Sequence, residues 1–305
     1  MTRILLLGTG ALATLFAARL GAAGHSVTLL GTWREALHAL NRDGARLILA
    51  DGSELRVPVC AVDTPAACTP VELALVLVKA WQTGRAAQHL AGCLTSTGVA
   101  LTFQNGWGND AILAESLGTA RVLLGICTYG ATSLAPGLAR VGGEGVLALQ
   151  THPRSEEIAV LLRAAGFQAQ IVSDAASLVW GKLVVNSAIN PLTALLRVPN
   201  GKLLEYPAAR SLLRALAQET AQVAQAQGVT LPFADSAAAV EEVARRTADN
   251  RSSMLQDVER GAPTEIEAIC GAVVRAAQAQ GMAAPLNWTM WQLVKAQVES
   301  FAFSW

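Results

Sequence analysis

The chain starts with a short apolar segment that leads into a glycine-rich turn. Residues 4–7 are continuously apolar, a turn with two glycines follows, and residues 12–23 have the apolar spacing of a helix. A second apolar run covers residues 27–30. A strand that passes through a tight turn into a helix and then into a second strand is a βαβ unit, whose strands lie parallel. The start of the chain therefore favours a parallel sheet with helices on its faces.

The turn itself has the pattern GxGxxA. Its residues are Gly8, Thr9, Gly10, Ala11, Leu12 and Ala13. The first glycine permits the tight turn, the second lets the backbone approach a pyrophosphate, and the alanine lets the helix lie close to the sheet. The helix N-terminus presents N–H groups to the phosphates. At this position the pattern indicates a dinucleotide site, and the alternative is an ordinary tight βα turn.

Apolar runs and helical stretches continue to alternate through the first half of the chain. Further strands are predicted at residues 73–78, 99–103, 122–127 and 168–172, and helices at residues 83–93, 110–117 and 155–166. Continuous apolar strands are typical of parallel sheets that are covered on both faces. Glycine turns also predict two hairpins, one between residues 46–49 and 55–59 and one between residues 138–141 and 146–149.

After Asp174 the strand patterns end, and an alanine-rich helical periodicity continues to the C-terminus. Long helices are predicted at residues 208–228, 236–247, 265–281 and 286–301. The sequence therefore predicts an α/β fold, with an N-terminal Rossmann-type dinucleotide-binding domain at residues 1–174 and an all-α domain at residues 175–305. Trp288, Trp291 and the segment 301–305 are expected to be packing residues.

Composition and charge exclude several classes of function. The net charge is zero, which gives no reason to expect nucleic acid or an anionic membrane as a partner. The five cysteines show no CxxC spacing, so we expect free thiols in a reducing cytoplasm and no metal site. The apolar N-terminus resembles a secretory signal, but glycines and Arg19 interrupt it. No later stretch has the ~20 apolar residues of a membrane span.

The end of the second strand bears on the choice of cofactor. An NAD site usually has a carboxylate there, about 20 residues after the glycines. This chain has Thr32 and Arg34 at that point and no carboxylate between them. A guanidinium can bind a 2′-phosphate in a bidentate manner. The sequence therefore favours NADP(H) over NAD(H), and the alternative is that Arg34 is a solvated charge at the start of a helix.

Polar residues follow two of the predicted strands. Lys79 and Gln82 come after one strand, and Asn105 comes after the next. In an open α/β sheet the carboxyl ends of the strands line the ligand crevice. We therefore expect these residues near the cofactor. The alternatives are a surface lysine and a simple Asn-Gly turn.

Two segments of the helical half also carry polar residues. Lys182, Asn186 and Asn190 have the spacing i, i+4, i+8 and form a stripe about 12 Å long on one helix, either solvated or lining a cavity. Ser253 and Thr264 can cap the helices that follow them, and Glu267 completes a capping box with Thr264. Ser253 and Glu265 can also face a pocket from the helix starts.

These segments, in this order, resemble the ketopantoate reductase (2-dehydropantoate 2-reductase) family. The matching stretches are GTGALA, KAWQ, QNGWG, WGKLVVNSAINPLTAL and SMLQD with TEI, and they extend over nearly the whole chain. The resemblance implies reduction of ketopantoate to pantoate with NADP(H), a step of pantothenate and coenzyme A biosynthesis. Thr32 stands where the family often has arginine, and Ala13 where glycine is common.

The resemblance also implies a role for each matching residue. Lys182 is then the general acid, and Glu265 is a catalytic carboxylate that orients the substrate and lies near the cofactor. Asn186, Asn190, Ser253 and Asn105 bind the substrate. The cofactor is bound by the glycine turn together with Thr32, Arg34, Lys79, Gln82, Asn105 and Glu265.

Other readings of the sequence stay open. The chain can be a related enzyme that reduces another small 2-oxo acid, a β-hydroxyacid dehydrogenase, or a non-catalytic NADP-binding sensor. A small-molecule substrate is expected in the two enzymatic cases. The alanine-rich helices can also form the interface of a homodimer.

Overall fold

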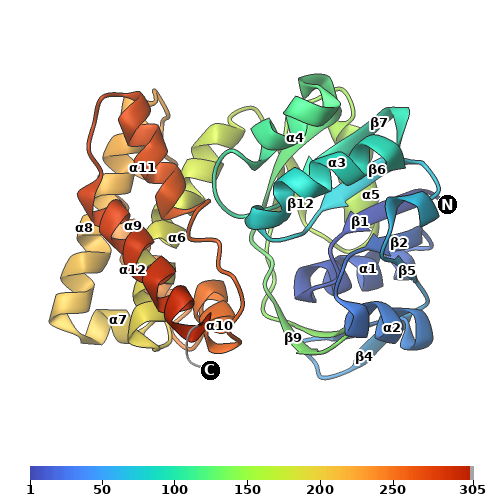
Figure 1. Cartoon of the computed structure of the whole chain (residues 1–305), viewed down its shortest axis with the longest axis horizontal. Helices are drawn as coiled ribbons and strands as arrows, with labels where there is room; N and C mark the ends of the chain where they lie inside the picture. The colour runs from blue at the N-terminus through green and yellow to red at the C-terminus, as the bar shows by residue number, and fades with distance from the viewer. Residues whose placement is uncertain (303–305) are drawn as a thin grey trace. The chain divides into compact units, whose positions relative to one another are not determined.

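A computed structural model of the chain describes residues 1–302 (Figure 1). These residues form two compact units, which we describe separately. The first unit comprises residues 1–104 and 109–175, and it contains the strands. The second comprises residues 105–108 and the helical chain from Ala176 on.

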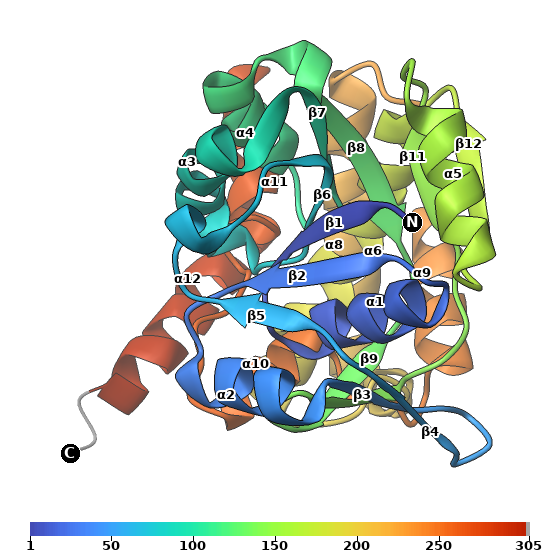
Figure 2. The same cartoon turned by 90° about the vertical axis from the view of Figure 1, so that its right-hand side faces the viewer.

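The main sheet of the first unit is parallel over most of its width. Its strands, in spatial order, are β12 (Ala169–Val172), β11 (Leu147–Gln150), β8 (Val122–Cys127), β7 (Leu94–Thr102), β6 (Val71–Val76), β1 (Arg3–Leu7), β2 (Ser26–Leu30) and β5 (Cys60–Val62) (Figure 2). The pairs from β8 to β5 are parallel, and β11 is antiparallel to β8. The predicted parallel sheet is therefore confirmed.

Helices cover both faces of this sheet. They are α1 (Ala11–Ala22), α2 (Arg34–Asp43), α3 (Thr83–Cys93), α4 (Asn109–Leu117) and α5 (Ser155–Ala164), with short 3-10 turns η1 (Pro65–Ala67), η2 (Ala80–Gln82) and η3 (Thr119–Arg121). Along β1, Leu6 lies in one core with Phe16 of α1, while Leu5 lies in another with Leu90 of α3. Both faces of β1 are buried, which explains its continuous apolar sequence.

A smaller sheet packs beside α1. Its strands, in order, are β4 (Glu54–Val57), β3 (Ala45–Ile48), β10 (Leu138–Val141) and β9 (Ala131–Ala135). The pair β3–β4 is antiparallel, so the first predicted hairpin is confirmed.

The second predicted hairpin is wrong. Strand β10 pairs with β9 and β3, whereas β11 belongs to the main sheet. The Gly142-Gly143 segment carries the chain from one sheet to the other.

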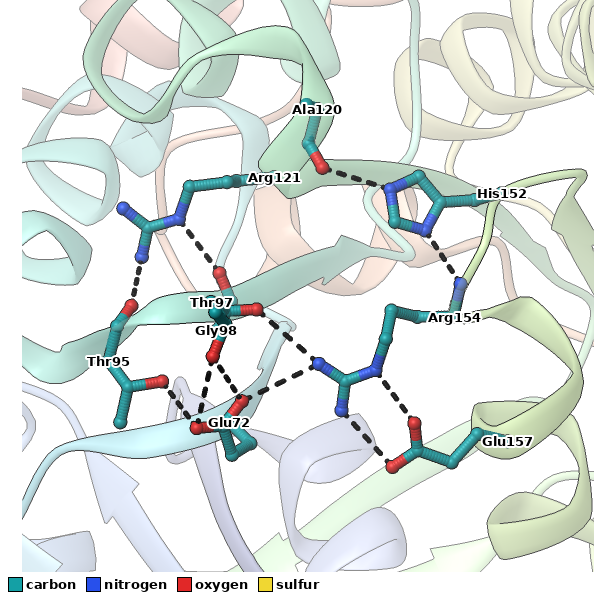
Figure 3. A network of polar contacts seen from close by, with 9 residues as sticks. All are labelled: Glu72, Thr95, Thr97, Gly98, Ala120, Arg121, His152, Arg154 and Glu157. Carbon is teal, nitrogen blue, oxygen red and sulfur yellow. Dashed lines mark hydrogen bonds and ion pairs between the residues drawn. The ribbon is translucent and has the colours of Figure 1, made fainter.

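A polar network lies at the edge of the main sheet where the parallel strands begin. Figure 3 shows its members, which are Glu72, Thr95, Thr97, Gly98, Ala120, Arg121, His152, Arg154 and Glu157. The Arg154 guanidinium donates to Glu157 at 2.7 and 3.1 Å and lies 3.5 Å from Glu72 at the start of β6. The Arg154 backbone N–H donates to His152 Nδ1 at 3.1 Å. This network ties α5 to the edge opposite the carboxyl ends of β6 and β7, so its role is structural.

The second unit is a helical bundle around its own core. Its helices are α6 (Ala175–Leu196), α7 (Lys202–Glu205), α8 (Pro207–Ala226), α9 (Ser236–Arg246), α10 (Ser253–Glu259), α11 (Cys270–Ala279) and α12 (Pro285–Ala302). The core includes Trp180 and Leu183 of α6 and Leu213 of α8. Within residues 1–302, no helix is long and apolar enough to cross a membrane.

Two expectations for this unit need correction. The helix expected from residue 265 begins only at Cys270, because residues 265–269 form turns. Trp291 packs against the core, but Trp288 is 53% exposed and is not a packing residue. Residues 303–305, also expected to pack, lie outside the described part of the chain.

Candidate functional site

The glycine turn lies at the carboxyl end of β1, between β2 and β6. The Gly8 N–H donates to Leu30 O of β2 at 2.8 Å, and Leu77, just after β6, donates to Leu7 O at 2.9 Å. Gly8 has φ +127°, and a Cβ there would lie 3.1 Å from Leu77 O. Both the backbone angle and the close neighbour therefore require glycine.

Gly10 leaves space above the start of α1. The residue is exposed, and a Cβ on it would meet no atom within 4 Å. Gly10 is also the N-cap of α1, and it has no side chain to bond the first N–H groups of that helix. Ala13 is 1% exposed, which lets α1 lie close against the sheet. The turn thus has the room and the N–H donors that a diphosphate needs.

The turn also lies where the strand order reverses. From β1 the chain proceeds to β2 and β5 on one side and to β6, β7 and β8 on the other. Ligands of open α/β sheets bind at such a switch point, outside the carboxyl ends of the strands. Lys79 follows β6 as the N-cap of η2 and is half-buried, and Gln82 ends η2 beside α3. The structure places both residues at this edge.

Thr32 and Arg34 stand beyond the carboxyl end of β2. Both are exposed, and Arg34 is the first residue of α2. A Cβ on Gly31 would lie 2.7 Å from the Thr9 side chain, so the end of β2 contacts the glycine turn directly. The structure adds a residue that the sequence analysis missed. Arg85 of α3 approaches Thr32, with Nη2 at 3.5 Å from Oγ1.

In the second unit, α6 carries the predicted polar stripe. Lys182, Asn186 and Asn190 all lie in the single helix α6, as their spacing predicts. Lys182 and Asn186 are half-buried, and Asn190 is 6% exposed. The stripe therefore extends from two partly exposed residues to a buried one.

Pro191 interrupts the hydrogen bonds of α6 beside this stripe. Proline has no N–H, so the carbonyl of Ser187, four residues earlier, loses its usual helical partner. The Cys270 thiol, at the start of α11, donates to this carbonyl at 3.7 Å. Burial raises the pKa of the Cys270 thiol, so it stays protonated and keeps its donor. The thiol thereby supports α6 next to Asn190.

We expect Cys270→Ala to destabilise the helical unit by about 1–2 kcal/mol, because it removes this donor and leaves a small cavity. Urea unfolding measures the change. Cys60→Ala is the matched control, because Cys60 is exposed, and it is expected to leave stability unchanged. Equal stability of the two variants would contradict the supporting role of Cys270.

The QNGWG segment belongs to the helical unit from Asn105 on. Asn105 Nδ2 donates to Glu265 Oε2 at 3.0 Å, across 160 positions of sequence. The Trp107 N–H donates to Ala268 O at 3.0 Å, and the Trp107 ring lies 5.5 Å from that of Trp180. Gln104, the preceding residue, is held in the first unit by donation to Val78 O at 3.1 Å. Two predicted site residues, Asn105 and Glu265, are therefore brought together.

The predicted N-cap of α10 is wrong by one residue. Ser252 rather than Ser253 caps α10, because its Oγ accepts from the Leu255 N–H at 3.0 Å. Ser252 also bonds Thr193 of α6 at 2.7 Å, which fixes the start of α10 against the helix with the polar stripe. Ser253 is exposed at the first turn of α10.

The expected capping box at Thr264 does not form. Glu267 instead bonds Trp291 Nε1 at 2.9 Å and Arg275 at 2.5 Å. Glu265 itself is 5% exposed. Among the described residues, no group of three His, Cys, Asp or Glu side chains could hold a metal ion.

Taken together, the two units define a class of protein. A glycine turn at the switch point of a parallel sheet, joined to a helical unit with partly buried amides and a buried carboxylate, is typical of two-domain oxidoreductases that bind a dinucleotide. The chain belongs to the ketopantoate reductase family. The family model described as "Ketopantoate reductase PanE/ApbA" matches residues 4–154, and "Ketopantoate reductase PanE/ApbA C terminal" matches residues 174–299.

Individual relatives match nearly the whole chain. A 2-dehydropantoate 2-reductase of Archaeoglobus fulgidus is 38% identical, over 96% of this chain and 97% of the relative. A 2-dehydropantoate 2-reductase of Halobacterium salinarum is 36% identical, over 96% of this chain and 98% of the relative. Such relatives identify this chain as an enzyme of the oxidoreductase class.

Solved structures show the same fold. A PanE/ApbA family ketopantoate reductase from Ralstonia eutropha superposes with a TM-score of 0.91 at 28% identity, covering 98% of this chain and 99% of that one. A D-mandelate dehydrogenase with NADH and anilino(oxo)acetate has a TM-score of 0.92 over the same shares, at 24% identity. At that identity, the second likeness concerns the fold alone.

Proposed function

We propose that this protein catalyses the NADPH-dependent reduction of 2-dehydropantoate (ketopantoate) to pantoate, in pantothenate and coenzyme A biosynthesis. The observation that carries the proposal is the 3.0 Å hydrogen bond between Asn105 and Glu265. Within the second unit, it brings the amide of the QNGWG segment onto a buried carboxylate. Relatives named for this reaction match nearly the whole chain, which supports the same substrate.

The first unit has the features that a dinucleotide needs. The open space above Gly10 and the uncapped start of α1 suit the diphosphate. Thr32, Arg34, Lys79 and Gln82 would hold the remaining groups of the cofactor. When bound, the nicotinamide supplies the hydride for the ketone carbon. We infer that residues 1–174 act as the cofactor domain and residues 175–305 as the substrate domain.

Lys182 would supply the proton. As the ketone carbon is reduced, negative charge develops on its oxygen, and an ammonium within hydrogen-bond distance stabilises that charge and protonates the alkoxide. Lys182 is the cation of the polar stripe on α6, and it is only partly exposed. Its place in a long helix, anchored by the buried Trp180, suits the fixed geometry that proton donation needs.

A carboxylate and several neutral polar groups would orient the substrate. Glu265 would accept a hydrogen bond from the substrate hydroxyl, with Asn105 holding the carboxylate in place. Asn186 and Asn190, one and two turns along α6 from Lys182, can donate to the substrate carboxylate, and Ser253 can do so from the start of α10. Amides and hydroxyls fix orientation without adding charge to the site.

Steady-state assays with a panel of 2-oxo acids and both reduced cofactors test the proposal. We expect NADPH oxidation to be fastest with ketopantoate and to be much slower with NADH. Oxidation of β-hydroxy acids by NADP without reduction of any 2-oxo acid would contradict it. Tight NADPH binding without turnover across the panel would also contradict it and would indicate a sensor.

A further inference from the structure

The cofactor edge of the first unit contains a second arginine that comes from a distant part of the sequence. Arg85 lies in the first turn of α3, and its Nη2 is 3.5 Å from Thr32 Oγ1. Thr32 follows β2, and the neighbouring Gly31 contacts Thr9 of the glycine turn. Arg85 therefore reaches the end of β2 from the other side of the switch point.

We propose that Arg85 and Arg34 together bind the 2′-phosphate of NADPH with the help of the Thr32 hydroxyl, and that Arg85 sets the preference for NADPH over NADH. This inference rests on the proposed function and names a specificity residue for it. In a Rossmann-type unit the ribose that carries this phosphate lies at the end of the second strand. Arg34 and Thr32 stand at that point in sequence, and Arg85 joins them only in the fold.

The charges at this edge suit a dianion. Within residues 1–302, neither Arg34 nor Arg85 forms an ion pair with a carboxylate, although most other arginines near the surface do. The first turn of α3 has no acidic residue. On the same helix, burial lowers the pKa of His89, and the positive charge of Arg85 is the second cause. Arg85 lies near the Thr32 hydroxyl, and Arg34 follows Thr32 by two residues. Two exposed guanidinium groups without ion pairs at one edge are an arrangement that a phosphate stabilises.

The position of Arg85 also explains why a threonine can stand at position 32. A short hydroxyl side chain after β2 leaves room for a guanidinium from α3, and it supplies a donor for a phosphate oxygen. The charge that the family often places directly after this strand is then provided by a neighbouring helix. The arrangement requires the guanidinium fork at residue 85, because a lysine ammonium cannot bind two phosphate oxygens in one plane.

Binding of nucleotide fragments to the full chain tests this role without any turnover. Isothermal titration with 2′,5′-ADP and with 5′-AMP measures the contribution of the 2′-phosphate. We expect Arg85→Ala to weaken 2′,5′-ADP binding by about 10–100-fold and to leave 5′-AMP binding unchanged. Arg85→Lys should recover only part of the loss. Gln88→Ala, an exposed position on the same helix, is the matched control and should bind like the wild type.

The outcomes separate this inference from the proposed function. If Arg85→Ala binds 2′,5′-ADP as tightly as the wild type, or loses both fragments equally, the role of Arg85 is overturned, while NADPH-dependent reduction by the wild type can still stand. If the wild type binds neither fragment and no NADPH, the proposed function fails and this inference fails with it. Selective loss of 2′,5′-ADP in both Arg85→Ala and Arg34→Ala supports the two-arginine site.

Discussion

Replacement of Lys182 by methionine is expected to lower kcat for ketopantoate reduction by about 10²–10⁴-fold, the range typical of a lost general acid. Methionine keeps the length and the packing of the side chain but has no proton to donate. NADPH binding, measured by titration, should be unchanged, because Lys182 is not among the residues to which we assign the cofactor. The effect should therefore appear in kcat and not in cofactor affinity.

The pH profile gives a second measure of the same role. In the wild type, kcat/KM should fall at high pH as the acid loses its proton, and Lys182→Met should lose that limb of the profile. Lys202→Met is the matched control. Lys202 is exposed and paired with Glu205 at 2.7 Å, so its replacement should leave kcat at the wild-type value. An undiminished kcat in Lys182→Met would remove this lysine from the mechanism.

The elements that sequence patterns predict well are those whose signal is local. Strands such as β1 are buried on both faces, so their sequences are continuously apolar and easily recognised. Strands β5 and β9 were missed because they are short or largely exposed and have no such run. The second hairpin was predicted wrongly because its turn signal says nothing about pairing between distant strands, and β10 and β11 join different sheets.

The site shows the same division between local and distant information. The glycine turn and the stripe of Lys182, Asn186 and Asn190 depend on spacing along one element, and both lie where their spacing predicts. The cap of α10 was placed one residue too late, because the choice between Ser252 and Ser253 depends on backbone angles rather than on residue type. Arg85 could not be found from the sequence, since nothing local places α3 beside the end of β2.

The contact between Asn105 and Glu265 also joins residues that are distant in sequence, and local patterns do not predict it. Gly106, the residue after Asn105, makes this contact possible. Gly106 has φ +92°, and a Cβ on it would overlap the carbonyl oxygen of Ala268 and lie 2.7 Å from the Ala268 Cβ. The obstacle is backbone, which cannot move aside as a flexible side chain can. Only glycine therefore lets the segment 105–108 lie against residues 265–269.

Gly106→Ala is expected to detach this segment and to cost about 3 kcal/mol or more in the free energy of unfolding, together with most of the activity. Gly108→Ala is a matched control, because Gly108 has the same φ of +92° but a Cβ there would meet no atom within 4 Å. It should cost only the backbone strain of about 1–2 kcal/mol.

Urea unfolding gives both values, and near-UV circular dichroism reports the contact between Trp107 and Trp180. If the two variants lose equal stability and keep the tryptophan signal, then backbone strain alone explains Gly106. If instead only Gly106→Ala loses the signal and raises KM for ketopantoate, the glycine is what holds Asn105 on Glu265.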